Sequence, residues 1–322
     1  MKPTALLSLC CLLLLSCKGN RFDVPGKPDH TIKIVRFDQQ FHTHAPSIDS
    51  AFLRLYAVKI MEVGEPGSDN YRDFDALYHT DPDFTHLYDS CQQIFSETTK
   101  LETSLTWAFY RLNYFFPQMT IPTVYMHISG YGQSIISAPG ILSASLDKYL
   151  GADHPMYKLL YEPYQAQRMQ PDKLLSDYLL GWIQSEFTPN DLIAQNRLLD
   201  DVLYEGKIIF LTSLVLPEEP LEHLFAFTPK QLEWCKQHEK DMWDGVVQHQ
   251  LLYTTDSQII SRFIEEAPTT TYFPKESPGR AINWIGYRII QRYMEQHPKA
   301  SLQDLLSIKD AQLLLNGSAY HP

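Results

Sequence analysis

The sequence has little cysteine, and its histidines match no common metal-binding motif. Of the five cysteines, three fall within the first 17 residues, and Cys91 and Cys235 stand far apart without a Cys-x-x-Cys pair. These two thiols can build neither a zinc knuckle nor a dense disulfide framework, and a single disulfide between them stays open. None of the 12 histidines lies four residues from another, so the His-Glu-x-x-His helix of zinc peptidases is absent.

One histidine pair is close in sequence but lacks further ligands. His42 and His44 lie two residues apart near the end of a predicted strand, which would place both on one face. No acidic or histidine-rich segment accompanies them, and a zinc site needs three or four convergent ligands. The chain also lacks a glycine-rich phosphate loop and a Gly-x-Ser-x-Gly elbow. We therefore expect no metal, no cofactor and no catalytic residue.

Basic side chains are scarce. The chain has 27 Lys and Arg against 38 Asp and Glu, and residues 1–16 contain one lysine and no acid. Without those residues 26 basic and 38 acidic side chains remain, a formal charge of -12. No basic stripe is visible along the sequence, and recognition of a phosphate backbone depends on clustered Lys and Arg. Nucleic acid is therefore not an expected partner.

The N-terminus predicts a lipoprotein signal. Residues 3–15 are mostly apolar or small, and this run is too short for a transmembrane helix of about 20 residues. Ser16 precedes Cys17, and an apolar residue lies three positions before the cysteine, which resembles a lipobox. We expect a signal peptide over residues 1–16, acylation (palmitate) at Cys17 and a lipid-anchored tether over residues 17–30. An ordinary secretory signal is the alternative.

Periodicity of the apolar residues predicts one helix-rich domain over residues 31–322. Residues 31–37 alternate like a strand, and three short β-prone runs at 121–129, 134–137 and 141–147 predict an antiparallel meander. Helical spacing or capping patterns predict helices over 47–63, 171–187, 190–214 and 228–249, one or two helices over 83–116, and further helices from about 279 and 301 to the C-terminus. The expected fold class is helix-rich α+β, with a small antiparallel sheet packed against helices.

Several segments resemble the gliding-motility lipoprotein family GldB. The matching stretches run from one end of the chain to the other: the lipobox at Cys17, then residues 143–151 (SASLDKYLG), 178–187 (YLLGWIQSEF), 200–207 (DDVLYEGK), 282–287 (INWIGY) and 316–322 (NGSAYHP). The resemblance implies a zincin-like fold, because members of this family are remote relatives of predicted zinc peptidases. It also implies a place in the cell envelope, facing the periplasm, with a surface-exposed location as the alternative.

The resemblance also indicates where a metal site has been lost. The helix over 178–187 occupies the place of the His-Glu-x-x-His motif of the peptidase relatives, yet it contains no histidine. Glu205 corresponds to their downstream acid, and one carboxylate cannot hold zinc in a catalytic geometry. We take Trp182, Tyr204 and Glu205 as the candidate vacated cleft. The alternative is a core aromatic for Trp182 and a helix-surface or hydrogen-bonded acid for Glu205.

Three functions remain open at this point. The first is a non-catalytic pseudo-peptidase scaffold that supports gliding motility, or the linked protein-export machinery, through contacts with other envelope proteins. The second is a metallopeptidase with atypical ligands, in which Glu205 is joined by a distant histidine such as His238 or His249. The third is a solute- or glycan-binding lipoprotein that uses some of the 19 tyrosines as an aromatic platform.

Overall fold

A small mixed sheet lies within a largely helical chain. The structure is a computed structural model that describes residues 21–322. Its strands are β1 (Ile34–Arg36), β2 (Thr123–His127), β3 (Ile135–Ala138) and β4 (Ile141–Ser145), in the order β1-β2-β4-β3. The pairs β1–β2 and β2–β4 are parallel, and only the β3–β4 hairpin is antiparallel.

The predicted antiparallel meander is therefore wrong, although all its strands exist. After β2 the chain passes to the outer edge of the sheet, forms β3 there, and returns as β4 into the space between the two. β4 consequently runs in the same direction as β2, with Val124 opposite Leu142. Short β-prone runs indicate strands, but their sequence does not reveal which strand fills the central position.

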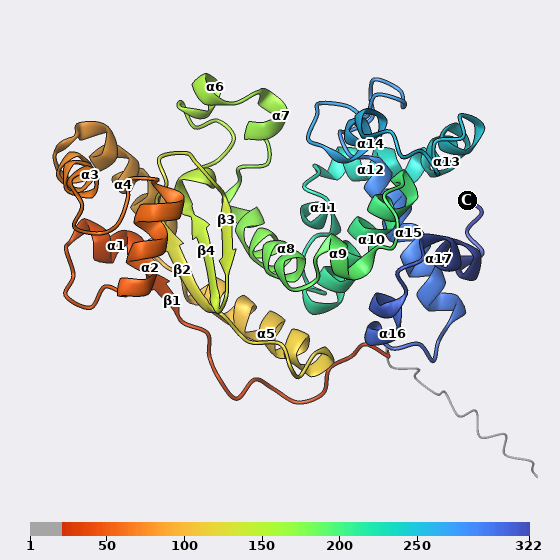
Figure 1. The fold of residues 1–322 in the computed structure, drawn as a ribbon, viewed down its shortest axis with the longest axis horizontal. Helices are drawn as coiled ribbons and strands as arrows, with labels where there is room; N and C mark the ends of the chain where they lie inside the picture. The colour runs from red at the N-terminus through yellow and green to blue at the C-terminus, as the bar shows by residue number, and fades with distance from the viewer. Residues whose placement is uncertain (1–20) are drawn as a thin grey trace, which may run out of the picture.

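The N-terminal helices cover one side of the sheet (Figure 1). They bury a cluster of aromatic rings that includes Phe37, Phe52 and Tyr125, and the rings of Phe52 and Tyr125 stack at 4.1 Å. The predicted helix over 47–63 is shorter and ends in a π-helical turn, Tyr56–Ile60. The bounds of the helices in this part are α1 (Phe37–His42), α2 (Ser50–Leu55), α3 (Asp69–Thr80), α4 (Pro82–Phe95) and α5 (Thr99–Phe115).

The C-terminal part is built around one long buried helix, α10 (Leu198–Val215), which packs most extensively against α15 (Ile282–Gln296). A single cluster of buried apolar side chains continues from the strands to the last helix. The remaining helices are α6 (Tyr157–Leu160), α7 (Pro163–Ala166), α8 (Leu174–Glu186), α9 (Pro189–Leu192), α11 (Leu221–Leu224), α12 (Pro229–Gln237), α13 (Glu239–Gln248), α14 (Ser257–Ile264), α16 (Leu302–Ser307) and α17 (Ala311–Ser318), and short 3₁₀ turns cover Leu146–Lys148 and Pro171–Lys173.

Local signals account for several helix ends. Thr228 and Gln231 form the predicted capping box at the start of α12, and Ser301 and Asp304 form the one at α16. Two predicted helices are each divided in two. The segment 190–214 breaks between α9 and α10, where the backbone N–H of the N-cap residue Arg197 donates a hydrogen bond to the Asp200 carboxylate. The segment 228–249 breaks at His238, whose ring stacks on Trp234.

The first residues that the structure describes are held against the helical part. The Arg21 guanidinium donates hydrogen bonds to the carbonyls of Met294, His297 and Ala300, and the Phe22 ring packs edge-on against Phe115 and Phe210. The expected tether is thus docked at this point, while the predicted signal peptide and Cys17 lie outside the described residues. Among residues 21–322, no helix has both the length and the apolar character needed to cross a bilayer.

Candidate functional site: a charged cleft beside the edge strand

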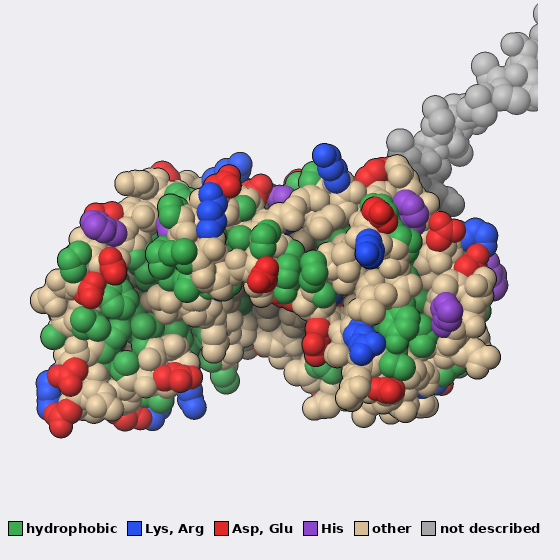
Figure 2. Space-filling model, turned by 90° about the horizontal axis from the view of Figure 1, so that it is seen from above, with side chains coloured by type: hydrophobic (Ala, Val, Ile, Leu, Met, Phe, Trp, Pro, Cys, Tyr) green, Lys and Arg blue, Asp and Glu red, His purple; other side chains and the backbone are tan. Residues whose placement is uncertain are grey.

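A cleft of about 280 Å³ lies beside the start of the edge strand β3, where Ser134 and Ile135 line it. β3 forms one wall, because it pairs with β4 on one side only. α8, α10 and the start of α15 form the others. Two neighbouring hollows share Arg168 and Glu266 with the cleft, so the recessed surface is continuous. The outer face in Figure 2 carries acidic and basic side chains interspersed among apolar ones, with no basic patch on that face.

Two carboxylates enter the cleft from different helices. Asp177 comes from α8 and Glu205 from α10. The Tyr149 hydroxyl donates a hydrogen bond of 2.8 Å to Oδ2 of Asp177. Burial raises the pKa of both carboxyl groups; the Tyr149 hydrogen bond opposes this at Asp177, and the charge of Arg280 opposes it at Glu205. Both acids therefore carry a desolvation cost when they are charged.

Two guanidinium groups face these carboxylates. Arg168 lies in the segment that leads to α8, and it forms an ion pair with Glu266 at the rim. Burial lowers the pKa of Arg168 to about 10, and burial also lowers the pKa of Arg280. No side-chain hydrogen bond or ion pair joins Arg280 to any residue between 21 and 322. Its backbone φ of +59° is in the left-handed region, which non-glycine residues rarely adopt.

Two buried polar atoms on the wall lack hydrogen-bond partners. Oδ1 of Asn283, whose residue is 5% exposed, and Nε of Arg168 have no partner in the part of the chain that the structure describes. A buried unsatisfied donor or acceptor costs about 1–3 kcal/mol. The cleft wall therefore presents one acceptor and one donor that no group of residues 21–322 satisfies.

The helix α8 approaches the edge strand unusually closely. Its cleft-lining residues are Asp177, Leu180, Gly181 and Gln184, which share one face at helical spacing. A Cβ atom on Gly181 would lie 2.6 Å from Cγ2 of Ile135, so only a glycine leaves room for β3 here. The Ser137 hydroxyl also donates a hydrogen bond of 3.3 Å to the Gly181 carbonyl. Ile135 thus occupies the space into which a side chain at position 181 would project.

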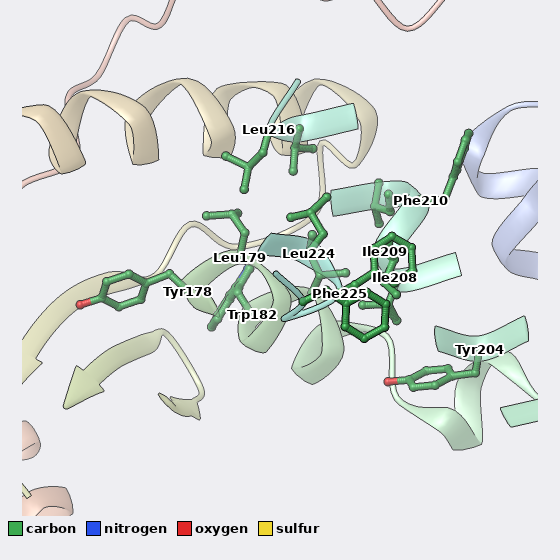
Figure 3. Packing of buried hydrophobic residues seen from close by; sticks show 14 of the residues in the cluster. Tyr178, Leu179, Trp182, Tyr204, Ile208, Ile209, Phe210, Leu216, Leu224 and Phe225 are labelled. Atoms are coloured by element: carbon green, nitrogen blue, oxygen red, sulfur yellow. The ribbon is translucent and has the colours of Figure 1, made fainter. Parts of the chain in front are cut away.

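The structure separates the three residues of the sequence-predicted cleft. Glu205 lines it. Trp182 is 1% exposed and Tyr204 is 7% exposed, and Figure 3 shows both among the buried apolar side chains of α8 and α10. Neither lines the cleft, because adjacent residues on a helix point about 100° apart. Trp182 follows Gly181, and Tyr204 precedes Glu205, so both turn away from the cavity.

Sequence reasoning missed Asp177, Arg280 and Asn283. Asp177 could have been found from its spacing with Gly181 and Gln184 on α8, which marks one polar stripe on an otherwise buried helix. Arg280 and Asn283 carry no local signal. They reach the cleft only because α15 crosses α10.

The histidines lie elsewhere. Neither His238 nor His249 lines the cleft, and the described lining contains no histidine or cysteine. His44 lies with Asp75 and His79 on the N-terminal helices, with one ligand atom of each within 4.8 Å of the others. Both ring nitrogens of His79 already face carbonyl oxygens, those of Asp75 at 2.7 Å and Phe41 at 3.1 Å. Its ring is therefore engaged by the backbone rather than presented to an ion.

These features define a helix-rich α+β protein with a charged cleft along the free edge of a small mixed sheet. The chain matches the family model described as gliding motility protein GldB over residues 21–322, and it belongs to that family. It is thus a gliding-motility-associated lipoprotein of the cell envelope. No curated protein and no solved structure matches the chain. The zincin-like architecture and the distant relation to zinc peptidases therefore stay predictions.

Proposed function

We propose that this protein is a non-catalytic lipoprotein, anchored through Cys17, that supports gliding motility or the linked export machinery by contacts with other envelope proteins. Membership of the GldB family supports the motility role. The geometry of the cleft supports the absence of catalysis, and exposed apolar side chains support contact with a partner.

The observation that carries the proposal is the contact between Gly181 and Ile135. Zinc peptidases hold their metal with two histidines four residues apart on one helical face. On the cleft face of α8, two such positions are Asp177 and Gly181. Glycine offers no ligand, and Ile135 fills the space that a ligand side chain would need, since its Cγ2 lies 2.6 Å from where a Cβ at position 181 would stand. This contact supports a cleft that holds no metal on α8.

The charges in the cleft also disfavour a metal. Glu205 is the downstream acid that the resemblance identifies. Burial raises its pKa, and the nearby Arg280 guanidinium opposes that rise. The Arg280 guanidinium near the carboxylates repels a divalent cation, and the described lining offers no imidazole or thiolate to compensate. An aromatic platform for glycans finds little support either, since Phe225 is the one aromatic residue of the main cleft wall.

Exposed apolar side chains on α6 support a protein contact. Leu159 is 77% exposed and Leu160 is 50% exposed, and α6 and α7 project from the body beside the cleft (Figure 1). Tyr161, the next residue, lines the hollow that continues from the cleft. Contiguous exposed apolar surface commonly marks an interaction site. This surface is the place where we expect another envelope protein to bind.

Elemental analysis of the full chain, purified in detergent without a histidine tag, tests the non-catalytic role. We expect no stoichiometric zinc and no hydrolysis of unstructured protein. One zinc per chain, lost in Glu205→Ala, would overturn the proposal in favour of a peptidase with atypical ligands.

Substitution of α6 tests the contact surface in cells that lack their own copy of the gene. We expect Leu159→Ser with Leu160→Ser to abolish gliding while the melting temperature stays unchanged. Leu313→Ser on α17 is the matched control, because Leu313 is also an exposed leucine, at 60%. Normal gliding of the double variant would exclude α6 as the contact.

A further inference from the structure

We infer that the charged cleft binds a small zwitterion, a molecule that carries a primary ammonium and a carboxylate, such as a free amino acid or a dipeptide. The inference rests on the proposed non-catalytic role of the same cleft and names the chemistry that it recognises. The supporting observations are the unpartnered polar atoms, the two sets of charges and the size of the cavity.

The first set of groups accepts hydrogen bonds. Asp177 and Glu205 present carboxylate oxygens, and Oδ1 of Asn283 is buried without a partner among residues 21–322. A primary ammonium has three N–H donors and one positive charge. It would satisfy the Asn283 oxygen and relieve the two carboxylates of a desolvation cost that burial imposes on them.

The second set donates hydrogen bonds. Nε of Arg168 is buried without a partner in the described part of the chain, and the Arg280 guanidinium forms no side-chain hydrogen bond there. A carboxylate accepts from guanidinium groups in geometries that are among the strongest hydrogen bonds in proteins. Both sets line one cavity, so a single small molecule reaches donors and acceptors together.

The balance of charge excludes simpler ligands. Glu266 pairs with Arg168 at the rim, which leaves Arg280 facing the two carboxylates, Asp177 and Glu205. These carboxylates would repel a simple anion. A simple cation would leave Nε of Arg168 without a hydrogen-bond acceptor. The volume of about 280 Å³ lies just below the roughly 300–1,000 Å³ typical of drug-sized pockets, which favours a ligand of one or two residues.

Calorimetry on the full chain in detergent tests this inference with defined probes. We expect L-alanine or L-alanyl-L-alanine to bind, and their N-acetylated or C-amidated forms to bind at least tenfold more weakly. Tighter binding of alanine would identify free amino acids as the source, and tighter binding of the dipeptide would identify short peptides. Equal affinities of the blocked and unblocked forms, or no detectable binding of either probe at concentrations up to about 10 mM, would overturn the inference.

Variants link the binding to the cleft. Glu205→Gln and Asn283→Leu keep side-chain size and should each weaken binding at least tenfold. Glu186→Gln, the same change on α8 but outside the cleft lining, should change affinity less than twofold. Zinc is measured in the same samples. Stoichiometric zinc would refute the proposed function. Zinc-free protein that binds neither L-alanine nor L-alanyl-L-alanine would refute this inference alone.

Discussion

Gly206 of α10 and Gly286 of α15 meet backbone against backbone where the two helices cross. A Cβ at position 206 would lie 2.5 Å from the carbonyl carbon and oxygen of Gly286, and one at position 286 would lie 2.1 Å from the Val202 carbonyl oxygen. Glycine inside a helix costs about 1 kcal/mol relative to alanine. The close crossing repays this cost by bringing two long buried helices together, and it carries the residues before and at the start of α15 to the cleft.

Alanine at either glycine should therefore destabilise the protein. We expect Gly206→Ala and Gly286→Ala each to lower the free energy of unfolding by about 3 kcal/mol or more, at the upper end of overpacking costs, because the obstructing atoms are backbone. Urea unfolding followed by circular dichroism measures the loss. Gly245→Ala in α13 is the control, since a Cβ there has nothing within 4 Å; it should stabilise by up to about 1 kcal/mol. If Gly206→Ala unfolded at the same urea concentration as the wild type, the close crossing of α10 and α15 would be refuted.

The contact between Gly181 and Ile135 predicts energetic coupling. Gly181→Ala should destabilise because its methyl group meets Cγ2 of Ile135, and Ile135→Ala should destabilise through lost packing. In the double variant the smaller side chain at 135 makes room, so its loss should fall short of the sum by about 1–2 kcal/mol. A double-mutant cycle in urea measures this difference. Additivity within about 0.5 kcal/mol would mean that the strand lies farther from α8.

Local chemistry made much of the helical structure predictable. The capping boxes at Thr228 and Ser301 fix helix starts by short-range hydrogen bonds, and both are where the sequence predicts them. Strand pairing is different, because β3 reaches the edge and β4 the centre through contacts between segments. The sequence predicts these strands but gives no physical reason to prefer a parallel β2–β4 pair.

The same difference between local signals and long-range contacts applies to the residues of the cleft. Glu205 was found because a family resemblance identifies it, and its helix presents it to the cleft. Arg280 and Asn283 belong to the cleft through the crossing of two helices far apart in sequence, which no local pattern encodes. The resemblance also assigns Trp182 and Tyr204 to the cleft, because they lie in the matching stretches 178–187 and 200–207. On a helix a shift of one residue is enough to turn a side chain into the core.

Lys207 on α10 predicts a stability change at alkaline pH. Its ammonium donates to the carbonyls of Leu192 and Ile308, and burial lowers its pKa from 10.5 to about 8 despite the charge of Asp200. Between these two pKa values the unfolded chain binds more protons than the folded one, so this residue makes stability rise with pH.

The difference in unfolding free energy between wild type and Lys207→Met isolates that contribution. It should shift in favour of the wild type by roughly 2–3 kcal/mol between pH 8 and pH 10, at about 1.4 kcal/mol per pKa unit. Guanidinium unfolding at half-unit pH intervals measures it, and titration of other groups cancels in the difference. A constant difference over this range would show that Lys207 stays charged when buried.

Glu205 predicts the opposite dependence at acidic pH. Burial raises its pKa above 4.5, so the folded chain binds more protons than the unfolded one once the pH passes that value. Its contribution to stability therefore falls as the pH rises. Glu205→Gln removes the buried charge and should become progressively more stable than the wild type from pH 4 to pH 7, in thermal or urea unfolding.

Glu65→Gln is the control of opposite sign, because hydrogen bonds from Arg54 lower the pKa of Glu65. Removal of the Glu65 charge should therefore cost stability only at the higher pH. Parallel curves for wild type and Glu205→Gln would mean that water solvates the carboxylate in the cleft, and the desolvated site would have to be abandoned.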